Sequence, residues 1–444
     1  MFEHVKNHLR YLLKRSESVT KTDNIYVAKQ GFWASFPYIV STLLSAGLVI
    51  AFANLLPKDL YGNYKYILSV AGILSFLTLS GMNTALTQAV ARGIKGLLAW
   101  SIDIQLRFNS IYALVCLAGA GYYWLHNNHT LAIGLIIMGI VFPFNTALTS
   151  YGAYLGGKKD FKTASDYAVI SNIFFAGLVL TTLLVTDSVV FLVAAYAIGV
   201  LTPSVFFYFK TVREDKGQVT AEEKNKVFNY SVHLSIVPII SVIAQYLDKI
   251  ILFQSFGSVQ LAVYSLAQAM PGRAQGLVKS ASSILLPKLS ERSMKEIRPI
   301  FYQRFIVGCI LGLLCFVTYW VISPFIFKVF LPSYLDSLDY SRVLMGSLIF
   351  SIPFNYIGAV FRSQKMIRAI YLSSFIARTP TLILYLFLGL AFGIWGMVWA
   401  NVSGLAITVI STVIIWEIES RRLHKLSNSN GNLPDESADI TAVS

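Results

Sequence analysis

Charged residues are scarce in this chain. Only 13% of its 444 residues are Asp, Glu, Lys or Arg, whereas 55% are hydrophobic. A typical soluble domain carries about 25% charged residues. The chain therefore has too few charges to cover the surface of a water-soluble globule of this length, and its composition excludes a soluble globular protein.

Cysteine is also rare, with three copies in the whole chain. Cys116, Cys309 and Cys315 all lie in apolar runs, and no pair has the spacing of metal ligands. We interpret them as small apolar packing residues. The sequence predicts neither a metal site nor a cofactor.

Catalytic motifs are absent as well. The sequence has no G-x-S-x-G, H-E-x-x-H or Walker A motif. His126 and His129 form an H-N-N-H segment that we interpret as part of a solvated loop. The connecting segments are short, whereas a membrane glycosyltransferase or polymerase would normally need a larger extracytoplasmic loop. The sequence therefore predicts a transporter and not an enzyme.

Long apolar runs, in contrast, fill the chain from Phe32 to Trp416. A helix of about 20 residues is long enough to cross a hydrocarbon core of about 30 Å. The sequence therefore predicts an all-α polytopic membrane protein with about twelve transmembrane helices. The expected spans are 32–55, 66–90, 108–126, 131–155, 164–186, 189–209, 229–253, 261–287, 305–327, 340–361, 369–391 and 393–416.

Lys and Arg gather in every second connection between these helices. The basic side includes both tails and the segment 210–226, whereas the other side holds only Lys58, Lys65 and Lys328. The positive-inside rule places the basic side, and hence both termini, in the cytoplasm. The net charge of +14 fits this pattern and contacts with anionic membrane lipids. It needs no nucleic-acid partner.

The longest and most charged connection divides the predicted helices into two groups of six, an arrangement common in transporters. For the N-terminal segment, an amphipathic helix on the membrane surface and a solvated basic tail are both open. The expected parts are a cytoplasmic segment 1–31, a six-helix lobe 32–209, a cytoplasmic linker 210–228, a second six-helix lobe 229–416, and a disordered cytoplasmic tail 417–444.

Two arginines lie near the middle of predicted helices. Arg273 follows Pro271 in MPGRAQG, and Arg378 precedes Pro380 in ARTP. A lipid-facing arginine at that depth costs roughly 3 kcal/mol, so such residues usually face a bundle interior or a water-filled cavity. We expect both to line a cationic, substrate-binding cavity. The alternative is a structural role, in which they bond carbonyls that the prolines leave free.

Three further charged residues belong to the predicted spans. Lys279 and Lys249 are added to the candidate cationic cavity, although Lys279 can snorkel to the interface. Asp248 is the candidate for ion coupling, with protons or sodium, because such carriers usually use an intramembrane carboxylate. The alternative is that Asp248 simply neutralises its neighbour Lys249.

Three stretches carry a resemblance to a known family. They are LLPKDLYGNYKYILSVAGILSFLTLSGMNTALTQAVARG (Leu55–Gly93), GGKKDF (Gly156–Phe161) and YSLAQAMPGRAQGLVKSASSILLPKLSER (Tyr264–Arg292). With the length and layout of the chain, they resemble the Wzx-type oligosaccharide flippases. These form the polysaccharide transporter branch of the multidrug/oligosaccharidyl-lipid/polysaccharide exporter superfamily. The lipid II flippases resemble this pattern too, but they have fourteen helices.

The resemblance implies two six-helix lobes in a V-shaped bundle around a central cavity. It also implies a prokaryotic inner membrane protein that moves undecaprenyl-pyrophosphate-linked oligosaccharide repeat units by alternating access. The product would be O-antigen, lipopolysaccharide or another surface polysaccharide, and other polysaccharide-assembly proteins would be partners. Two alternatives stay open. One is a multidrug exporter of the same superfamily, and the other is a membrane polymerase or acyltransferase.

Overall fold

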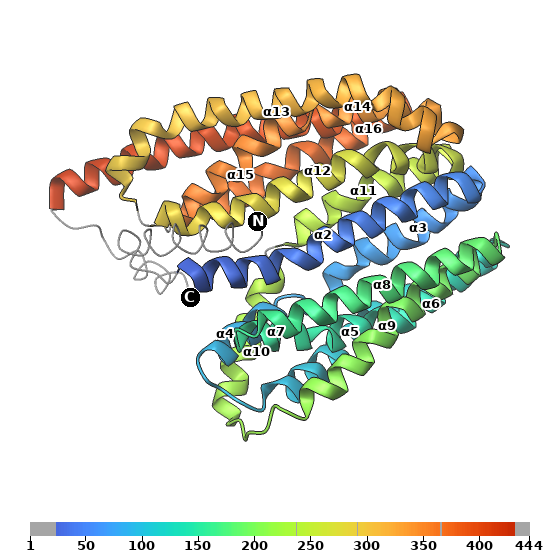
Figure 1. Ribbon diagram of the computed structural model, residues 1–444, viewed down its shortest axis with the longest axis horizontal. Coiled ribbons are helices and arrows are strands. Elements are labelled where there is room, and N and C mark those ends of the chain that lie inside the picture. The colour runs from blue at the N-terminus through green and yellow to red at the C-terminus, as the bar shows by residue number, and fades with distance from the viewer. Residues whose placement is uncertain (1–23, 237, 291, 365, 431–444) are drawn as a thin grey trace, which may run out of the picture. The chain divides into compact units, whose positions relative to one another are not determined.

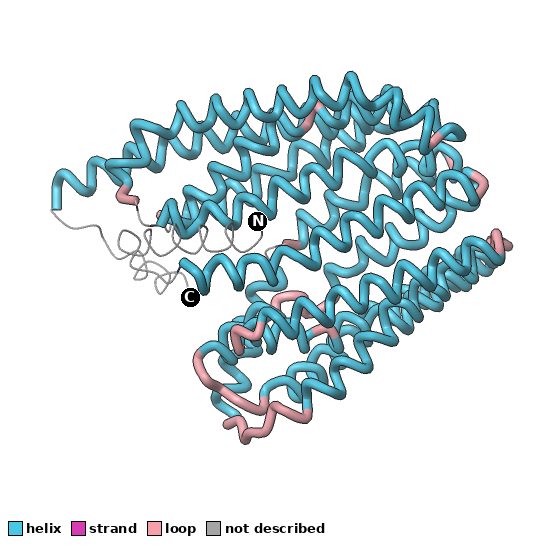
Figure 2. Tube along the Cα trace, viewed as in Figure 1, coloured by secondary structure: helices cyan, strands magenta, loops and turns pink. Residues whose placement is uncertain are grey.

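The computed structural model describes residues 24–236, 238–290, 292–364 and 366–430, apart from some side chains within them. In these ranges the chain is built of helices joined by short loops, without a strand (Figure 2). The elements are α2 (Asn24–Leu55), α3 (Lys58–Leu74), η1 (Ser75–Leu77), α4 (Met82–Ala91), α5 (Leu97–Leu125), α6 (His129–Leu148), α7 (Ser150–Gly157), α8 (Phe161–Val185), α9 (Val189–Val212), α10 (Ala221–Ile236), α11 (Ile239–Phe256), α12 (Ser258–Ser290), α13 (Met294–Phe330), η2 (Pro332–Ser337), α14 (Leu338–Met345), α15 (Leu348–Ser363) and α16 (Ile367–Asn430).

Each predicted span lies on one helix or on consecutive ones. The span 66–90 bends between α3 and α4, and the span 229–253 covers the end of α10 and most of α11. By length and hydropathy, eight helices of the described chain could cross a membrane, or nine when the bent pair α3–α4 counts as one span. Two more predicted spans lie on α5 and α12, which polar side chains such as Gln105 and Gln268 make less apolar. The last predicted pair lies within α16 alone.

α16 is a helical hairpin. As one straight helix its 64 residues would extend about 96 Å, far beyond a hydrocarbon core of about 30 Å. Gly393 breaks it with non-helical backbone angles of φ 59° and ψ −131°. Asn401 then donates a hydrogen bond to Tyr385 Oη at 2.9 Å, and Gly404 packs against Thr381. Residues so far apart in sequence meet because the two arms run antiparallel, as the predicted spans 369–391 and 393–416 require.

The described residues form two compact units. Unit 1 takes the residues up to Ala51 and those from Leu74 to Ile236, and unit 2 takes Phe52–Ile73 and the residues from Val237 onward. These bounds correct the predicted lobes 32–209 and 229–416. In Figure 1 the helices of unit 1 run from blue through green to yellow-green. The last residues of α2, from Phe52, and α3 up to Ile73 belong to unit 2.

The segment Phe52–Ile73 belongs to unit 2 because its aromatic and polar side chains pack there. The ring of Tyr66 stacks on Phe253 of α11 with centroids 3.8 Å apart. At the other end of α3, Lys58 forms an ion pair with Asp336 at 2.8 Å. These contacts join residues distant in sequence, and helical periodicity therefore could not predict them.

The predicted linker 210–228 is an integral part of unit 1. Its Asp215 accepts hydrogen bonds from the backbone N–H groups of Gly96, at 2.6 Å, and Leu98, at 2.8 Å. The carboxylate thus satisfies N–H groups at the start of α5 that lack a partner within the helix. Lys158 also pairs with Glu214 at 3.1 Å. The connection is therefore fixed to the bundle.

The core of unit 2 is centred on aromatic rings from α13, α15 and α16. Phe301 stacks on Trp416 with ring centroids 4.1 Å apart, and Phe361 lies beside the same tryptophan. All three side chains are almost fully buried. Gly312 of α13 lets that helix approach the backbone of α15 closely at Ile349. This packing fixes the helices that border the cavity described below.

Both predicted tails need correction or lie outside the described residues. α2 begins at Asn24, and residues 1–23 and 431–444 are not described. The predicted disorder of 417–444 is wrong for 417–430, where α16 continues. Glu417 accepts a hydrogen bond from Arg421 one turn later at 2.8 Å. The buried Glu419 lies 3.6 Å from both Arg368 and Arg422. These pairs extend a helix whose composition alone suggested a disordered tail.

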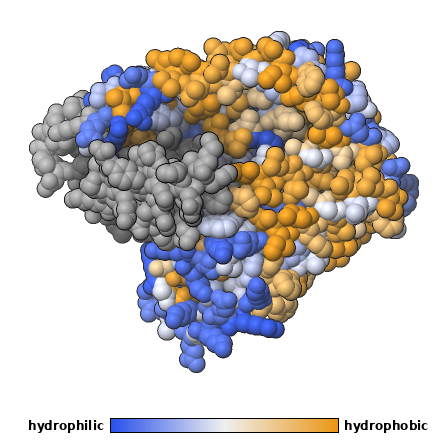
Figure 3. Space-filling view, viewed as in Figure 1, coloured by the Kyte–Doolittle hydropathy of each residue, from blue (hydrophilic) through white to orange (hydrophobic). Residues whose placement is uncertain are grey.

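The outer faces of the helices expose large apolar side chains. Leu125, Val185, Val321 and Phe387 are each more than two-thirds exposed. Hydrophilic side chains instead gather at the end of unit 1 that carries the α9–α10 connection (Figure 3). Apolar surface of this extent needs lipid and not water around it. The chain is therefore a multi-pass membrane protein.

Candidate functional site

A buried carboxylate marks unit 2. Asp248 of α11 is 2% exposed. Its Oδ2 accepts hydrogen bonds from Tyr264 Oη at 2.8 Å and from Gln268 Nε2 at 2.9 Å. Both donors lie on α12, four residues apart and therefore on one face of that helix. A carboxylate withdrawn from water needs such donors, because an isolated buried charge is very costly.

Lys249 stabilises the Asp248 carboxylate only weakly, although the two residues are neighbours in the sequence. Its Nζ lies 3.7 Å from Asp248 Oδ1 and donates instead to the carbonyl of Gln245 at 3.2 Å. The ammonium also lies 5.7 Å from the centre of the Tyr246 ring. Lys249 is thus turned toward its own helix, and the neutral donors Tyr264 and Gln268 hold the carboxylate.

The same network reaches the α16 hairpin. The Tyr385 side chain lies near Tyr264 and accepts a hydrogen bond from Asn401 at 2.9 Å. The sequence did not identify Tyr264, Gln268, Tyr385 or Asn401 as partners of this carboxylate. The four-residue spacing of Tyr264 and Gln268 was the signal available for the first of them. The partnership of Tyr385 and Asn401 depends on the turn at Gly393.

Two cations converge elsewhere in unit 2. Lys65 of α3 lies against the ring of Tyr61, with Nζ 5.2 Å from the ring centre. Its ammonium lies within electrostatic range of the Arg273 guanidinium of α12. Arg273 is exposed and Lys65 is half-buried. Like charges held close together favour an anion between them.

The sequence placed Lys65 in a connection between helices, whereas the structure places it on α3. α3 begins at Lys58, eight residues before the predicted span. Pro57 before the first turn and Asp59 within it favour a helix start at that point. Lys65 therefore lies about two turns inside the helix. Those two residues were the signal that could have identified it.

The remaining predicted cations are placed separately. Lys279 is exposed on α12. Arg378 lies on α16, but its side chain is outside the described residues. Gln275, two residues from Arg273, donates to Ser347 Oγ at 2.7 Å and so ties α12 to the α14–α15 turn. The structure thus brings Arg273 beside Lys65 and leaves Lys249 beside Asp248.

No group of three or more His, Cys, Asp or Glu side chains within the described ranges could hold a metal ion. The two clusters offer ionic and hydrogen-bonding contacts. One cluster presents a carboxylate to hydrogen-bond donors, and the other presents two cations. Both lie on helices that are predicted to be transmembrane.

Comparison with solved structures identifies the fold. The chain is similar to the lipid II flippase MurJ in an inward closed conformation, with a TM-score of 0.68, 16% identity and coverage of 87% of this chain and 88% of that chain. It is similar to an inward-facing multidrug resistance MATE family transporter of the MOP superfamily, with a TM-score of 0.68 and 15% identity. This match covers 87% of this chain and 96% of that chain. An outward-facing MATE family transporter matches with a TM-score of 0.62 and 14% identity, and the match covers 89% of this chain and 96% of that chain. The predicted all-α, two-lobed transporter fold is confirmed.

Comparison with curated protein sequences gives no match. The family model described as "Polysaccharide biosynthesis protein" matches residues 27–293. The matched segment is more than half of the chain, and it contains both Asp248 with its donors on α12 and the pair Lys65 and Arg273. The chain belongs to the polysaccharide biosynthesis protein family.

Proposed function

We propose that this protein is a flippase for lipid-linked oligosaccharides. Its substrate is an undecaprenyl-pyrophosphate-linked repeat unit, which it carries across the cytoplasmic membrane by alternating access for O-antigen, lipopolysaccharide or other surface polysaccharide. The family match supports a role in polysaccharide biosynthesis. The fold, shared with a lipid flippase and with drug transporters, supports transport without chemical conversion of the substrate.

The observation that carries the proposal is the convergence of Lys65 and Arg273. The two side chains lie within electrostatic range of each other, and one pyrophosphate would bond to both. Arginine suits this role because its planar fork bonds two phosphate oxygens at once. Asp248 is the proposed ion-coupling residue, with protons or sodium as the driving ion. Arg378, Lys279 and Lys249 remain further candidates for contact with the substrate.

The test is complementation of a strain whose own flippase has been deleted. Lys65→Ala and Arg273→Ala should each lower surface polysaccharide about tenfold or more, because each removes a charge-assisted contact of about 1.5–3 kcal/mol. Undecaprenyl-linked intermediates should accumulate. Lys328→Ala is the matched control, because it removes an exposed lysine of unit 2 that lies on α13 and not on α3 or α12. Membrane levels of every variant are measured.

Equal complementation by wild type, Lys65→Ala and Arg273→Ala would contradict the role of these cations. The buried Asp248 favours a second candidate, a multidrug exporter, because an intramembrane carboxylate attracts organic cations. That alternative predicts drug resistance that is lost in Asp248→Asn and kept in Arg273→Ala. The flippase predicts no such resistance.

A further inference from the structure

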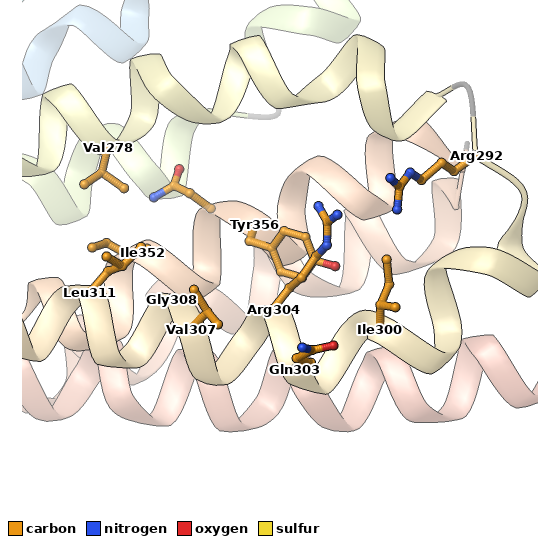
Figure 4. A pocket seen from close by; sticks show the side chains of 11 residues that line it. Val278, Arg292, Ile300, Gln303, Arg304, Val307, Gly308, Leu311, Ile352 and Tyr356 are labelled. Atoms are coloured by element: carbon orange, nitrogen blue, oxygen red, sulfur yellow. The ribbon is translucent and has the colours of Figure 1, made fainter.

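A cationic cavity lies within unit 2, between α12, α13 and α15. Its volume is about 580 Å³, within the range of about 300–1,000 Å³ that is typical of small-molecule sites. Figure 4 shows that the guanidinium groups of Arg292 and Arg304 lie toward one end, whereas Val278, Leu311 and Ile352 line the other. Neither Lys65 nor Arg273 lines this cavity.

The two arginines come from different elements. Arg292 lies in the connection between α12 and α13, where its carbonyl accepts a hydrogen bond from Gln364 Nε2 at 3.0 Å. Arg304 lies on α13. Both are exposed, and no carboxylate of the described residues lies within ion-pair distance of either guanidinium. Two cations thus face the cavity without a described counter-ion.

Tyr356 of α15 adds a polar group to the cationic end. The residue is 7% exposed, and its hydroxyl has no hydrogen-bond partner among the described residues. It lies within electrostatic reach of both Arg304 and Arg292. A buried hydroxyl without a partner is costly, so one that lines a cavity indicates a partner supplied by a ligand.

We propose that this cavity binds an anionic phospholipid of the surrounding bilayer. The lipid phosphate lies between Arg292 and Arg304 and accepts a hydrogen bond from Tyr356, and the acyl chains follow the apolar wall formed by Val307, Leu311 and Ile352. The arginines lie at the helix ends that the positive-inside pattern assigns to the cytoplasm. Basic pockets between transmembrane helices on that side suit anionic headgroups.

The test measures lipid binding to the purified full-length protein by native mass spectrometry in detergent, with phosphatidylglycerol and phosphatidylcholine as probes. Phosphatidylglycerol should bind at least about tenfold more tightly than phosphatidylcholine. Arg292→Gln and Arg304→Gln should each lower the affinity for phosphatidylglycerol about tenfold, because each removes one charge-assisted contact. The affinity for phosphatidylcholine should not change. Arg107→Gln is the matched control, because this exposed arginine of unit 1 pairs with Asp103 instead.

Two further measurements separate the lipid from other occupants. Val307→Trp fills the apolar part of the cavity with a larger side chain and keeps both arginines. It should therefore lower the affinity for phosphatidylglycerol without changing the affinity for inorganic phosphate. Competition by inorganic phosphate at equal affinity would overturn the proposal, because the site would then bind a free anion. Stronger binding of undecaprenyl phosphate that is lost in Arg304→Gln would assign the cavity to the transported lipid and would also overturn it. The proposed function is tested separately, by complementation with Arg273→Ala, because Arg273 does not line this cavity.

Discussion

The carboxylate of Asp248 depends on two hydrogen-bond donors from a neighbouring helix. Tyr264→Phe removes one of them and leaves the ring in place. We expect the free energy of unfolding to fall by about 0.6–1.7 kcal/mol, the range of interhelical hydrogen bonds in membranes. Asp248→Asn should instead abolish dependence of transport on the driving ion. Unfolding in mixed micelles and transport into vesicles with and without a sodium or proton gradient measure the two effects.

Gln245→Ala serves as the control for both measurements, since its described contact, the carbonyl that accepts from Lys249, is unchanged by the substitution. Ion-dependent transport by Asp248→Asn at the wild-type level would show that the carboxylate is structural. If Tyr264→Phe lowers the free energy of unfolding and leaves the ion dependence of transport unchanged, the hydrogen bond from Tyr264 serves only to hold the Asp248 carboxylate in place.

Single residues were predictable where their chemistry conflicts with a membrane. Arg273 and Asp248 were proposed as site residues because a charge within an apolar run needs a specific role, and their roles stay predictions. Lys65 was missed, since it precedes the apolar run from which the span was defined. Tyr264 was missed because a tyrosine in a helix is ordinary, and only its contact with Asp248 distinguishes it.

Among the elements, the α16 hairpin depends on one glycine. Gly393 has φ 59° and ψ −131°, a conformation that side chains with a Cβ rarely adopt. Gly393→Ala should lower the free energy of unfolding by about 1–3 kcal/mol, the usual cost of a strained backbone. It should also weaken transport, because Tyr385 and Asn401 would lose their register across the hairpin. Thermal unfolding and complementation measure these effects.

Gly177→Ala is the control, since Gly177 lies inside α8 and a Cβ there meets nothing within 4 Å. Alanine favours the helix by about 0.5–1 kcal/mol at such a position, so this variant should be as stable as wild type or more stable. A Gly393→Ala protein that matches it would show that the hairpin does not need glycine.

Helices were predicted well and their ends less well, for one physical reason. Hydropathy locates the stretch that must be in lipid, and the twelve expected spans all lie on helices. Helix ends depend on capping and on local pairs. α3 therefore starts early at Lys58, and the α16 helix extends past Trp416 with the help of Glu417 and Arg421.

At the scale of the whole molecule, the sequence predicted the number of units but not their bounds. Phe52–Ile73 joins unit 2 through Tyr66 and Lys58. The segment 210–228 stays in unit 1 through Asp215. Both assignments depend on contacts between residues far apart in sequence, which neither charge nor hydropathy encodes. Loop length therefore located the division only approximately.

Orientation in the membrane is the prediction that belongs to the entire chain. The basic connections assign the α9–α10 loop to the cytoplasm and the α5–α6 and α8–α9 loops to the opposite side. In a variant without Cys116, Cys309 and Cys315, single cysteines can replace exposed residues of these loops. Asn127→Cys and Asp187→Cys should react with a membrane-impermeant maleimide on intact cells.

Gln218→Cys, in the α9–α10 loop, should react only after the membrane is opened. All three positions are exposed in the folded chain, so a difference in labelling reports the side of the membrane and not burial. The reverse pattern would invert the topology and place the cavity at Arg292 and Arg304 on the outer side. The same labelling at all three positions would instead require an even number of spans between the α8–α9 and α9–α10 loops. That result would contradict the helix order from α5 to α9, in which α6 with α7 forms one span and α8 and α9 form one span each.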